Sequence, residues 1–200
     1  MSLTKFLDST TDLYHPIRHW NQKDLSLLTG EKGQYKLALR WQVAFVQAGY
    51  KVFNLDCAVR FNPFLITAET RLQNIPPEPF LEEILIQRAF TPYQILDSLI
   101  ALLQNPKPDT IYFLLAPCKQ FLDGDVKDDE GLFLLHKMLH VLESFPKRQI
   151  PLLVVESWSY RHKNFQKFFP KLLGSANNLW ELQTEDGLSR IKTRKIALAG

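Results

Sequence analysis

The chain has 200 residues, of which 46% are hydrophobic and 22% charged, a composition typical of one globular domain with a full core. It has no apolar run long enough to span a bilayer, and its first eleven residues lack the apolar core of a secretory signal. We therefore expect a cytoplasmic protein without membrane contact. The two cysteines, Cys57 and Cys118, have neither a disulfide framework nor a metal-type spacing.

The formal net charge of +3 is unevenly distributed along the chain. From Lys147 to the end there are ten Lys/Arg and four Asp/Glu, whereas the first 146 residues hold 14 basic and 17 acidic residues. A basic C-terminal quarter permits a polyanionic partner without requiring one.

The chain begins with a polar, irregular stretch. Residues 1–24 predict an N-terminal arm that packs on a single domain formed by residues 25–200. Leu25 to Thr29 predicts a short strand, and the apolar spacing from Tyr35 to Ala48 predicts a helix. Lys51 to Asp56 predicts a buried strand that ends in an acid.

Prolines divide the next part of the chain. Phe61 to Leu72 predicts a short helix, and Ile75 to Pro79 predicts a loop because it holds three prolines. Glu83 to Ala89 is strand-like. Thr91 predicts the cap of a helix that begins at Pro92, since proline is favoured in the first turn.

Two continuous apolar runs follow, and they are typical of parallel strands covered on both faces. These runs are Thr110 to Ala116 and Ile150 to Glu156. Between them we expect an acidic loop at Lys119 to Gly131 and a helix at Leu132 to Phe145. A further helix is expected where Phe165 to Leu172 shows helical spacing.

The C-terminal region alternates like a hairpin. Leu179 to Thr184 and Leu188 to Thr193 flank the turn signal Glu185-Asp186-Gly187. Strands that alternate with helices predict an α/β domain with an open, mostly parallel central sheet, to which this hairpin adds antiparallel strands.

The turn after the first strand resembles a damaged phosphate loop. In the pattern G-x-x-x-x-G-K-[ST], Gly30 and Lys36 take the first glycine and the lysine positions, with Gly33 between them. Tyr35 stands where the last glycine belongs, and Leu37 stands where a Mg²⁺-binding hydroxyl belongs. The stretch is either a strand–turn–helix joint with a chance Gly and Lys, or a phosphate loop that has lost its chemistry.

Several segments together resemble the RecA/RadA recombinase core over Leu25 to Ile196. Besides the loop at Gly30, the resemblance is carried by Gly49 to Phe61, Ile86 to Thr91, Tyr112 to Phe121, Leu152 to Ser157 and the terminal hairpin. It implies a RecA-like three-layer α/β/α fold of the P-loop NTPase class.

The departures from the family pattern affect every part of ATP hydrolysis. The family's water-activating glutamate matches Ala58, and its Mg²⁺-ordering aspartate matches Ala116. Glu156 and Ser157 stand where the family senses the γ-phosphate. With Tyr35 and Leu37 added, the resemblance implies that Gly30, Gly33 and Lys36 form a degenerate nucleotide loop. We therefore expect no ATPase activity and no ATP or Mg²⁺ as cofactor.

Histidine pairs give no convincing metal site. His136 and His140, like His15 and His19, have a spacing of four residues but no third ligand nearby in sequence. The Asp123 to Asp129 stretch lacks the order of a calcium loop. We predict no bound metal.

Trp158 to Lys171 mixes aromatic and basic residues, as single-strand binders do. It also falls where the family resemblance implies the second DNA-contacting loop. For the phenylalanines the favoured interpretation is the core face of a helix. The candidate DNA contacts are Arg161, Lys163, Lys167, Lys171, Arg190 and Lys192, with Arg194 and Lys195 as an extension.

The leading functional hypothesis is a non-catalytic RecA-like accessory protein in DNA repair or recombination. It would act through a protein partner (a recombinase, a polymerase-associated repair factor or a second copy of itself) and through weak binding of single-stranded DNA. One alternative is a nucleotide-binding protein or ATPase with an atypical P-loop. Another is a structural assembly subunit with no nucleic-acid role.

Overall fold

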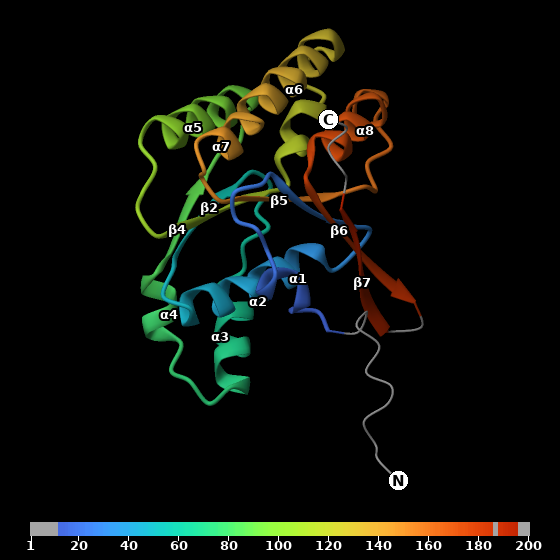
Figure 1. The fold of residues 1–200 in the computed structure, drawn as a ribbon. Coiled ribbons are helices and arrows are strands. Elements are labelled where there is room, and N and C mark those ends of the chain that lie inside the picture. The colour runs from blue at the N-terminus through green and yellow to red at the C-terminus, as the bar shows by residue number, and fades with distance from the viewer. Residues whose placement is uncertain (1–11, 186–187, 196–200) are drawn as a thin grey trace.

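A computed structural model describes residues 12–185 and 188–195 of the chain (Figure 1). The strands are β1 (Ser26–Gly30), β2 (Lys51–Asp56), β3 (Ile84–Arg88), β4 (Thr110–Leu115), β5 (Leu152–Ser157), β6 (Asn178–Glu185) and β7 (Leu188–Lys195). The helices are α1 (His15–Arg18), α2 (Gln34–Gln47), α3 (Pro63–Leu72), α4 (Glu78–Glu82), α5 (Pro92–Gln104), the 3₁₀ helix η1 (Pro117–Leu122), α6 (Asp128–Leu142), α7 (Ser144–Lys147) and α8 (Lys163–Ser175).

The strands form one seven-stranded sheet in the order β3-β2-β4-β5-β1-β6-β7. The pairs β2–β3, β2–β4, β4–β5, β1–β5 and β1–β6 are parallel, and only β6–β7 is antiparallel. The fold class predicted from the sequence, an α/β domain with a mostly parallel sheet and a C-terminal antiparallel hairpin, is confirmed. The tip of that hairpin, Asp186-Gly187, lies outside the described residues.

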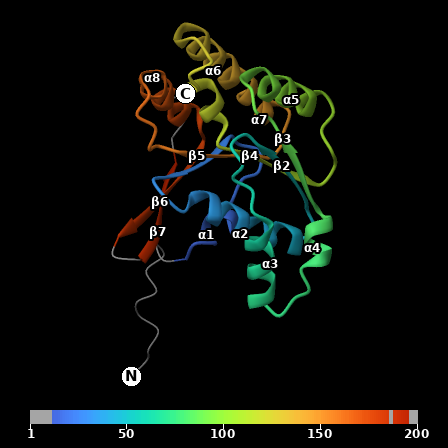
Figure 2. The ribbon, with the colours of Figure 1, turned by 180° about the vertical axis from the view of Figure 1, so that it is seen from behind.

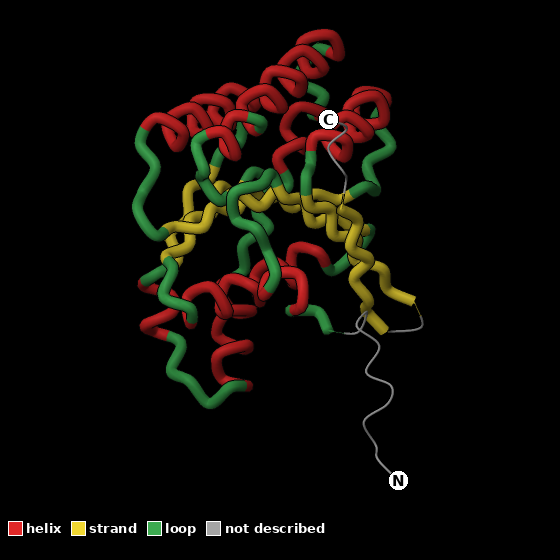
Figure 3. Tube along the Cα trace, viewed as in Figure 1, coloured by secondary structure: helices red, strands yellow, loops and turns green. Residues whose placement is uncertain are grey.

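Helices cover both faces of the sheet, so the described chain forms three layers (Figures 1 and 3). One core lies beneath α5 to α8 and contains Leu27, Leu114 and Phe168. The other lies beneath α2 to α4 and contains Leu28 and Trp180. Seen from behind, the same two helical layers flank the sheet (Figure 2). Adjacent strand residues such as Leu27 and Leu28 therefore supply opposite cores, which explains the continuous apolar runs.

Local signals set several boundaries. The Thr91 hydroxyl accepts a hydrogen bond from the Gln94 backbone N–H at 3.2 Å, so the predicted cap of α5 is present. Phe165 and Phe168 are buried in the core beneath α8, which confirms their interpretation as its apolar face.

Two predicted loops are shorter than expected: only residues 75–77 of the first and 123–127 of the second lie outside helices. Pro79 lies in the first turn of α4, where its missing N–H has no helical partner to lose. The expected loop at Lys119 to Gly131 instead contains the end of η1 and the first turn of α6. That turn holds Asp128, Asp129 and Glu130, and negative charges stabilise the N-terminal end of a helix.

The described part of the N-terminal arm packs under α2. Trp20 belongs to the core on that side, and the Trp41 indole N–H donates to the Leu13 carbonyl oxygen at 2.8 Å. Residues 1–11 of the predicted arm lie outside the described residues. None of the described helices has the length and apolar character needed to cross a membrane.

The connections after the neighbouring strands β1 and β5 leave the sheet on opposite faces. β1 leads to α2 on one face, while its neighbour β5 leads to α8 on the other. Open α/β sheets bind ligands outside the carboxyl ends of strands at such a switch point. We call the space at the ends of β1 and β5 the switch-point crevice, bounded by Gly30 and Ser157.

Candidate functional site

The turn between β1 and α2 is short and depends on its glycines. A Cβ atom on Gly30 would lie 3.0 Å from the Leu182 carbonyl oxygen of β6. Gly33 caps α2 with a φ of 89°, in the left-handed region that favours glycine. Both glycines are thus required by the backbone itself, without any bound phosphate.

The Tyr35 side chain lies in the switch-point crevice. Its hydroxyl donates to Oε1 of Glu156 at 3.1 Å, and the Arg60 guanidinium carbon lies 5.0 Å from its ring centroid. Burial and the neighbouring Glu156 raise the pKa of Tyr35 well above its usual range, so the hydroxyl stays protonated. The position expected for the last glycine of a phosphate loop therefore carries an aromatic ring whose hydroxyl reaches the end of β5.

Glu156 is fully buried near the end of β5. Its Oε2 accepts the Cys118 backbone N–H at 2.8 Å, and its Oε1 accepts the Ser157 backbone N–H at 2.8 Å. Burial raises the pKa of Glu156, and these two N–H groups partly oppose the rise. The carboxyl group joins the ends of three elements, β5, η1 and α2.

Asp56 holds the loop that carries Arg60. Its buried carboxylate accepts backbone N–H groups from Arg60 at 2.8 Å and from Phe61 at 3.1 Å, and the Arg88 Nε lies 3.8 Å away. Val59 in this loop has a φ of 53°. The acid predicted at the end of β2 thus fixes the turn that places a guanidinium over Tyr35.

The remaining positions of the degenerate nucleotide loop do not converge on a ligand. Lys36 is exposed on α2, whereas Leu37 is buried in the core beneath it. Ala58 and Ala116 contribute only methyl groups at the ends of β2 and β4. Across residues 12–185 and 188–195, no group of three or more His, Cys, Asp or Glu side chains could hold a metal ion.

The cysteines behave as core residues. Cys57 and Cys118 are both fully buried, and burial raises the pKa of each thiol well above its usual value. A thiol that stays protonated is a weak nucleophile and a poor metal ligand.

The candidate DNA contacts fall into two groups. Arg161, Lys163, Lys167 and Lys171 are exposed at or before α8, and Arg190 and Lys192 are exposed on β7. In the β6–β7 ladder, Arg190 lies opposite Gln183 and Lys192 opposite Glu181. These positions share the sheet face of Leu179, which packs in the core beneath α8. The two groups therefore lie on one side of the sheet. The side chains of Arg194 and Lys195 lie outside the described part.

Two of these lysines have close neighbours. Lys163 forms an ion pair of 2.5 Å with Asp128, and this pairing lowers the pKa of that carboxyl. The Lys171 ammonium lies 3.2 Å from the His136 ring nitrogen, which works against a metal ion at that histidine. Of the three candidate lysines in α8, Lys167 is therefore the one best placed to meet a phosphate.

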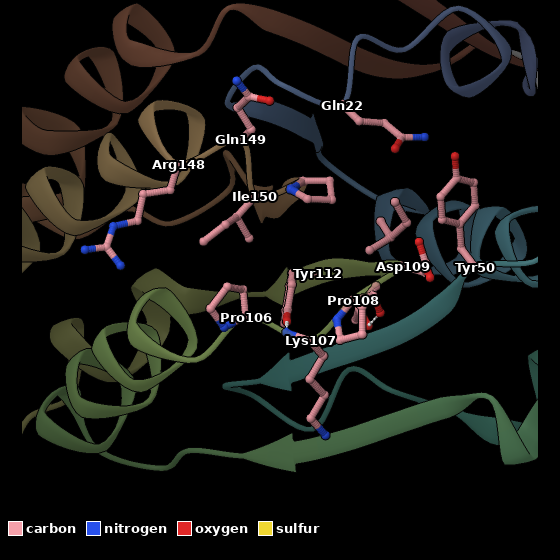
Figure 4. A pocket seen from close by; sticks show the side chains of 13 residues that line it. Gln22, Tyr50, Pro106, Lys107, Pro108, Asp109, Tyr112, Arg148, Gln149 and Ile150 are labelled. Atoms are coloured by element: carbon pink, nitrogen blue, oxygen red, sulfur yellow. Dashed lines mark hydrogen bonds between the residues drawn. The ribbon is translucent and has the colours of Figure 1, made fainter.

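A separate pocket of about 420 Å³ lies at the opposite ends of the strands, beside the first residues of β2, β4 and β5. Gln22 and Tyr50 stand on one side of it and Arg148 on the other (Figure 4). None of its lining residues was a candidate from the sequence, because turns far apart in the chain form it. The one feature of this pocket that is visible in the sequence is the turn from Pro106 to Pro108, which holds two prolines.

Comparison with known proteins adds no assignment. Neither a scan against models of protein families nor a search of curated proteins gives a match.

Replacing Tyr35 by phenylalanine removes one donor from the buried Glu156 carboxyl group. We expect Tyr35→Phe to lower the free energy of unfolding by about 1 kcal/mol, because Oε1 of Glu156 loses one of its two hydrogen-bond donors and keeps only the Ser157 backbone N–H. Urea denaturation followed by tryptophan fluorescence measures the change. The matched control is Tyr93→Phe, whose exposed hydroxyl donates to Glu130; it should change stability by less than about 0.5 kcal/mol. Equal effects of the two variants would refute the buried role of Tyr35.

Glu156 should make stability depend on pH. Because its pKa in the native state is raised above 4.5, the native protein retains a proton that the unfolded chain releases as the pH rises past that value. The free energy of unfolding then falls with increasing pH by up to about 1.4 kcal/mol per unit. This fall should disappear in Glu156→Gln and persist in the control Glu31→Gln, an exposed acid. The measurement is urea denaturation from acidic to neutral pH, and an unchanged pH slope in Glu156→Gln contradicts it.

Proposed function

We propose that this protein is a non-catalytic, RecA-like accessory protein of DNA repair or recombination. It acts through protein partners and through weak contact with single-stranded DNA. The observation behind the non-catalytic part of the proposal is the Tyr35 side chain, whose hydroxyl bonds to Glu156 and whose ring lies under Arg60.

The absence of catalysis is supported by how the crevice is filled. Phosphoryl transfer depends on positioned backbone N–H groups, a lysine and a metal ion. Here Tyr35 stands at the sequence position of the pattern's last glycine, with its hydroxyl bonded to Glu156, and Leu37 faces the core. A nucleotide would have to displace a hydrogen-bonded, largely buried tyrosine.

Nucleic-acid contact is supported by the shared side of α8 and β7. Lys167, Arg190 and Lys192 are exposed there. Exposed cations on one side of a sheet suit a flexible polyanion, whose affinity then comes from phosphate contacts. Asp128 offsets part of this charge through Lys163, which favours weak rather than tight binding.

Action through a protein partner is supported by the other edge of the sheet. Among the described strands β3 pairs with β2 alone, and four of its five residues are exposed. Leu85 and Ile86 are 42% and 45% exposed, and Phe90 and Tyr93, just after this strand in the chain, are exposed as well. Open apolar edge strands are usually protected in isolated proteins, since they pair with other chains.

The DNA half of the proposal predicts salt-dependent binding. Fluorescence anisotropy with a labelled oligothymidylate should show binding at low salt that weakens steeply as salt rises. Each lost phosphate contact reduces the slope of log K against log [salt] by about 0.7. Lys167→Ala and Arg190→Ala should each show this reduction.

The matched control is Arg71→Ala, because Arg71 is exposed on α3 in the opposite helical layer. Its slope should equal that of the parent chain. No binding at low salt would refute the DNA half and favour a structural assembly subunit.

The non-catalytic half predicts no response to nucleotide. A ligand at ten times its Kd stabilises a protein by about 1.4 kcal/mol, which raises Tm by roughly 3–6 °C in a chain of this size. Millimolar Mg-ATP should leave Tm unchanged in the parent chain and in Lys36→Ala. A rise that Lys36→Ala abolishes would instead support a nucleotide-binding protein with an atypical loop.

A further inference from the structure

A hollow lies just outside the switch-point crevice, because strand β6 extends three residues further than its neighbour β1 at this end of the sheet. β1 ends at Gly30, which pairs with Leu182, whereas β6 continues to Glu185. The overhang leaves a hollow of about 470 Å³ beside the β1–α2 turn. Its walls are Glu31, Lys32, Trp158, Leu182, Gln183 and Thr184. We call this space the overhang hollow.

Trp158 forms the aromatic wall of this hollow. The chain has four tryptophans; Trp20, Trp41 and Trp180 are at most 8% exposed, but Trp158 is 36% exposed. Its backbone N–H donates to the Gly30 carbonyl oxygen at 3.3 Å, which anchors its backbone beside the end of β1. An indole ring that is partly exposed to solvent and fixed beside polar groups can stack against the flat ring of a ligand.

The groups around Trp158 are mainly cationic or neutral and polar. Lys32 is exposed on the turn, and Arg190 lies opposite Gln183 across the β6–β7 ladder. Gln183 offers an amide, and Thr184 offers a hydroxyl that lies 3.4 Å from Ser189. Glu31 is the one acid among the six wall residues.

We propose that the overhang hollow is a base-stacking site, in which one nucleobase of a single-stranded nucleic acid lies on the Trp158 indole. The phosphates on either side of that base face Lys32 and Arg190. The site rests on the proposed contact with single-stranded DNA, and it assigns the stacking residue that the basic side chains of α8 and β7 do not supply.

A nucleobase fits this hollow better than a cation does. A cationic group would be drawn to the Trp158 face by Glu31, but it would also meet Lys32 and Arg190. The wall itself holds one cation, Lys32, and one acid, Glu31, and Arg190, opposite the wall residue Gln183, adds a second cation nearby. Stacking on an aromatic ring accepts any base. The amide of Gln183 can then donate to or accept from a base edge.

The fluorescence of Trp158 can report whether a base is bound in the hollow, because the other three tryptophans are buried. Titration with a short oligothymidylate at low salt should quench the intrinsic fluorescence of the parent chain. In Trp158→Phe the quenching should be lost while anisotropy still shows binding within a few-fold of the parent, since a ring remains. Trp158→Ala should weaken binding by roughly 5- to 150-fold, the equivalent of about 1–3 kcal/mol per stacked base.

Two controls separate stacking from charge. Phe133→Ala removes an exposed aromatic from α6 (67% exposed) and should leave binding unchanged. An abasic oligomer, with the same phosphates but no bases, should bind more weakly than the oligothymidylate and leave Trp158 unquenched.

The outcomes distinguish this site from the broader proposal. Salt-dependent binding with unquenched Trp158, and with Trp158→Ala as tight as the parent, overturns the stacking site and leaves the DNA contact standing. No binding of any oligomer at low salt overturns both. Quenching by a trimethyl-lysine peptide but not by oligothymidylate shows that the hollow takes cations, and this also overturns the inference.

Discussion

The buried carboxyl group of Glu156 determines how the switch-point crevice is closed. A carboxyl group without solvent must find hydrogen-bond donors in the protein. It finds them in the Cys118 and Ser157 backbone N–H groups and in the Tyr35 hydroxyl. These donors come from the start of η1, from β5 itself and from the first turn of α2. One side chain thus joins segments that are up to 121 residues apart.

The turn from β1 into α2 shows how one sequence pattern can have two physical causes. Glycines in this place suggest a phosphate cradle, but here Gly30 makes room for the Leu182 carbonyl oxygen and Gly33 adopts a positive φ. Lys36, the third member of the pattern, faces solvent on α2. The glycines are therefore explained by the fold itself, and Tyr35 adds a hydrogen bond from the start of α2 to Glu156.

The fold could be predicted well from local patterns. Continuous apolar runs such as Thr110 to Ala116 indicate strands with two covered faces, and Thr91-Pro92 marks a helix start by its own chemistry. General rules about loops are less reliable than these patterns. The first helical turn tolerates Pro79, and the acids near Asp128 suit a helix N-terminus as well as a loop.

The site was less predictable because its contacts are long-range. Nothing near Tyr35 in the sequence indicates Glu156, and nothing near Trp158 indicates Lys32. Their proximity depends on the strand order, which places β5 and β6 on either side of β1. The aromatic and basic character of the Trp158 stretch was visible, but only the structure separates its buried phenylalanines from its exposed tryptophan.

Gly30 physically connects the closed crevice and the open hollow. Its carbonyl oxygen accepts the Trp158 backbone N–H and the Ser157 hydroxyl, and its Cα faces the Leu182 carbonyl oxygen. The same residue ends β1, and so creates the overhang of β6. The strand ends that hold the Tyr35 side chain therefore also border the overhang hollow beside the β1–α2 turn. The ends of β1 and β5 thus hold the Tyr35 side chain on one side and leave the Trp158 indole partly exposed on the other.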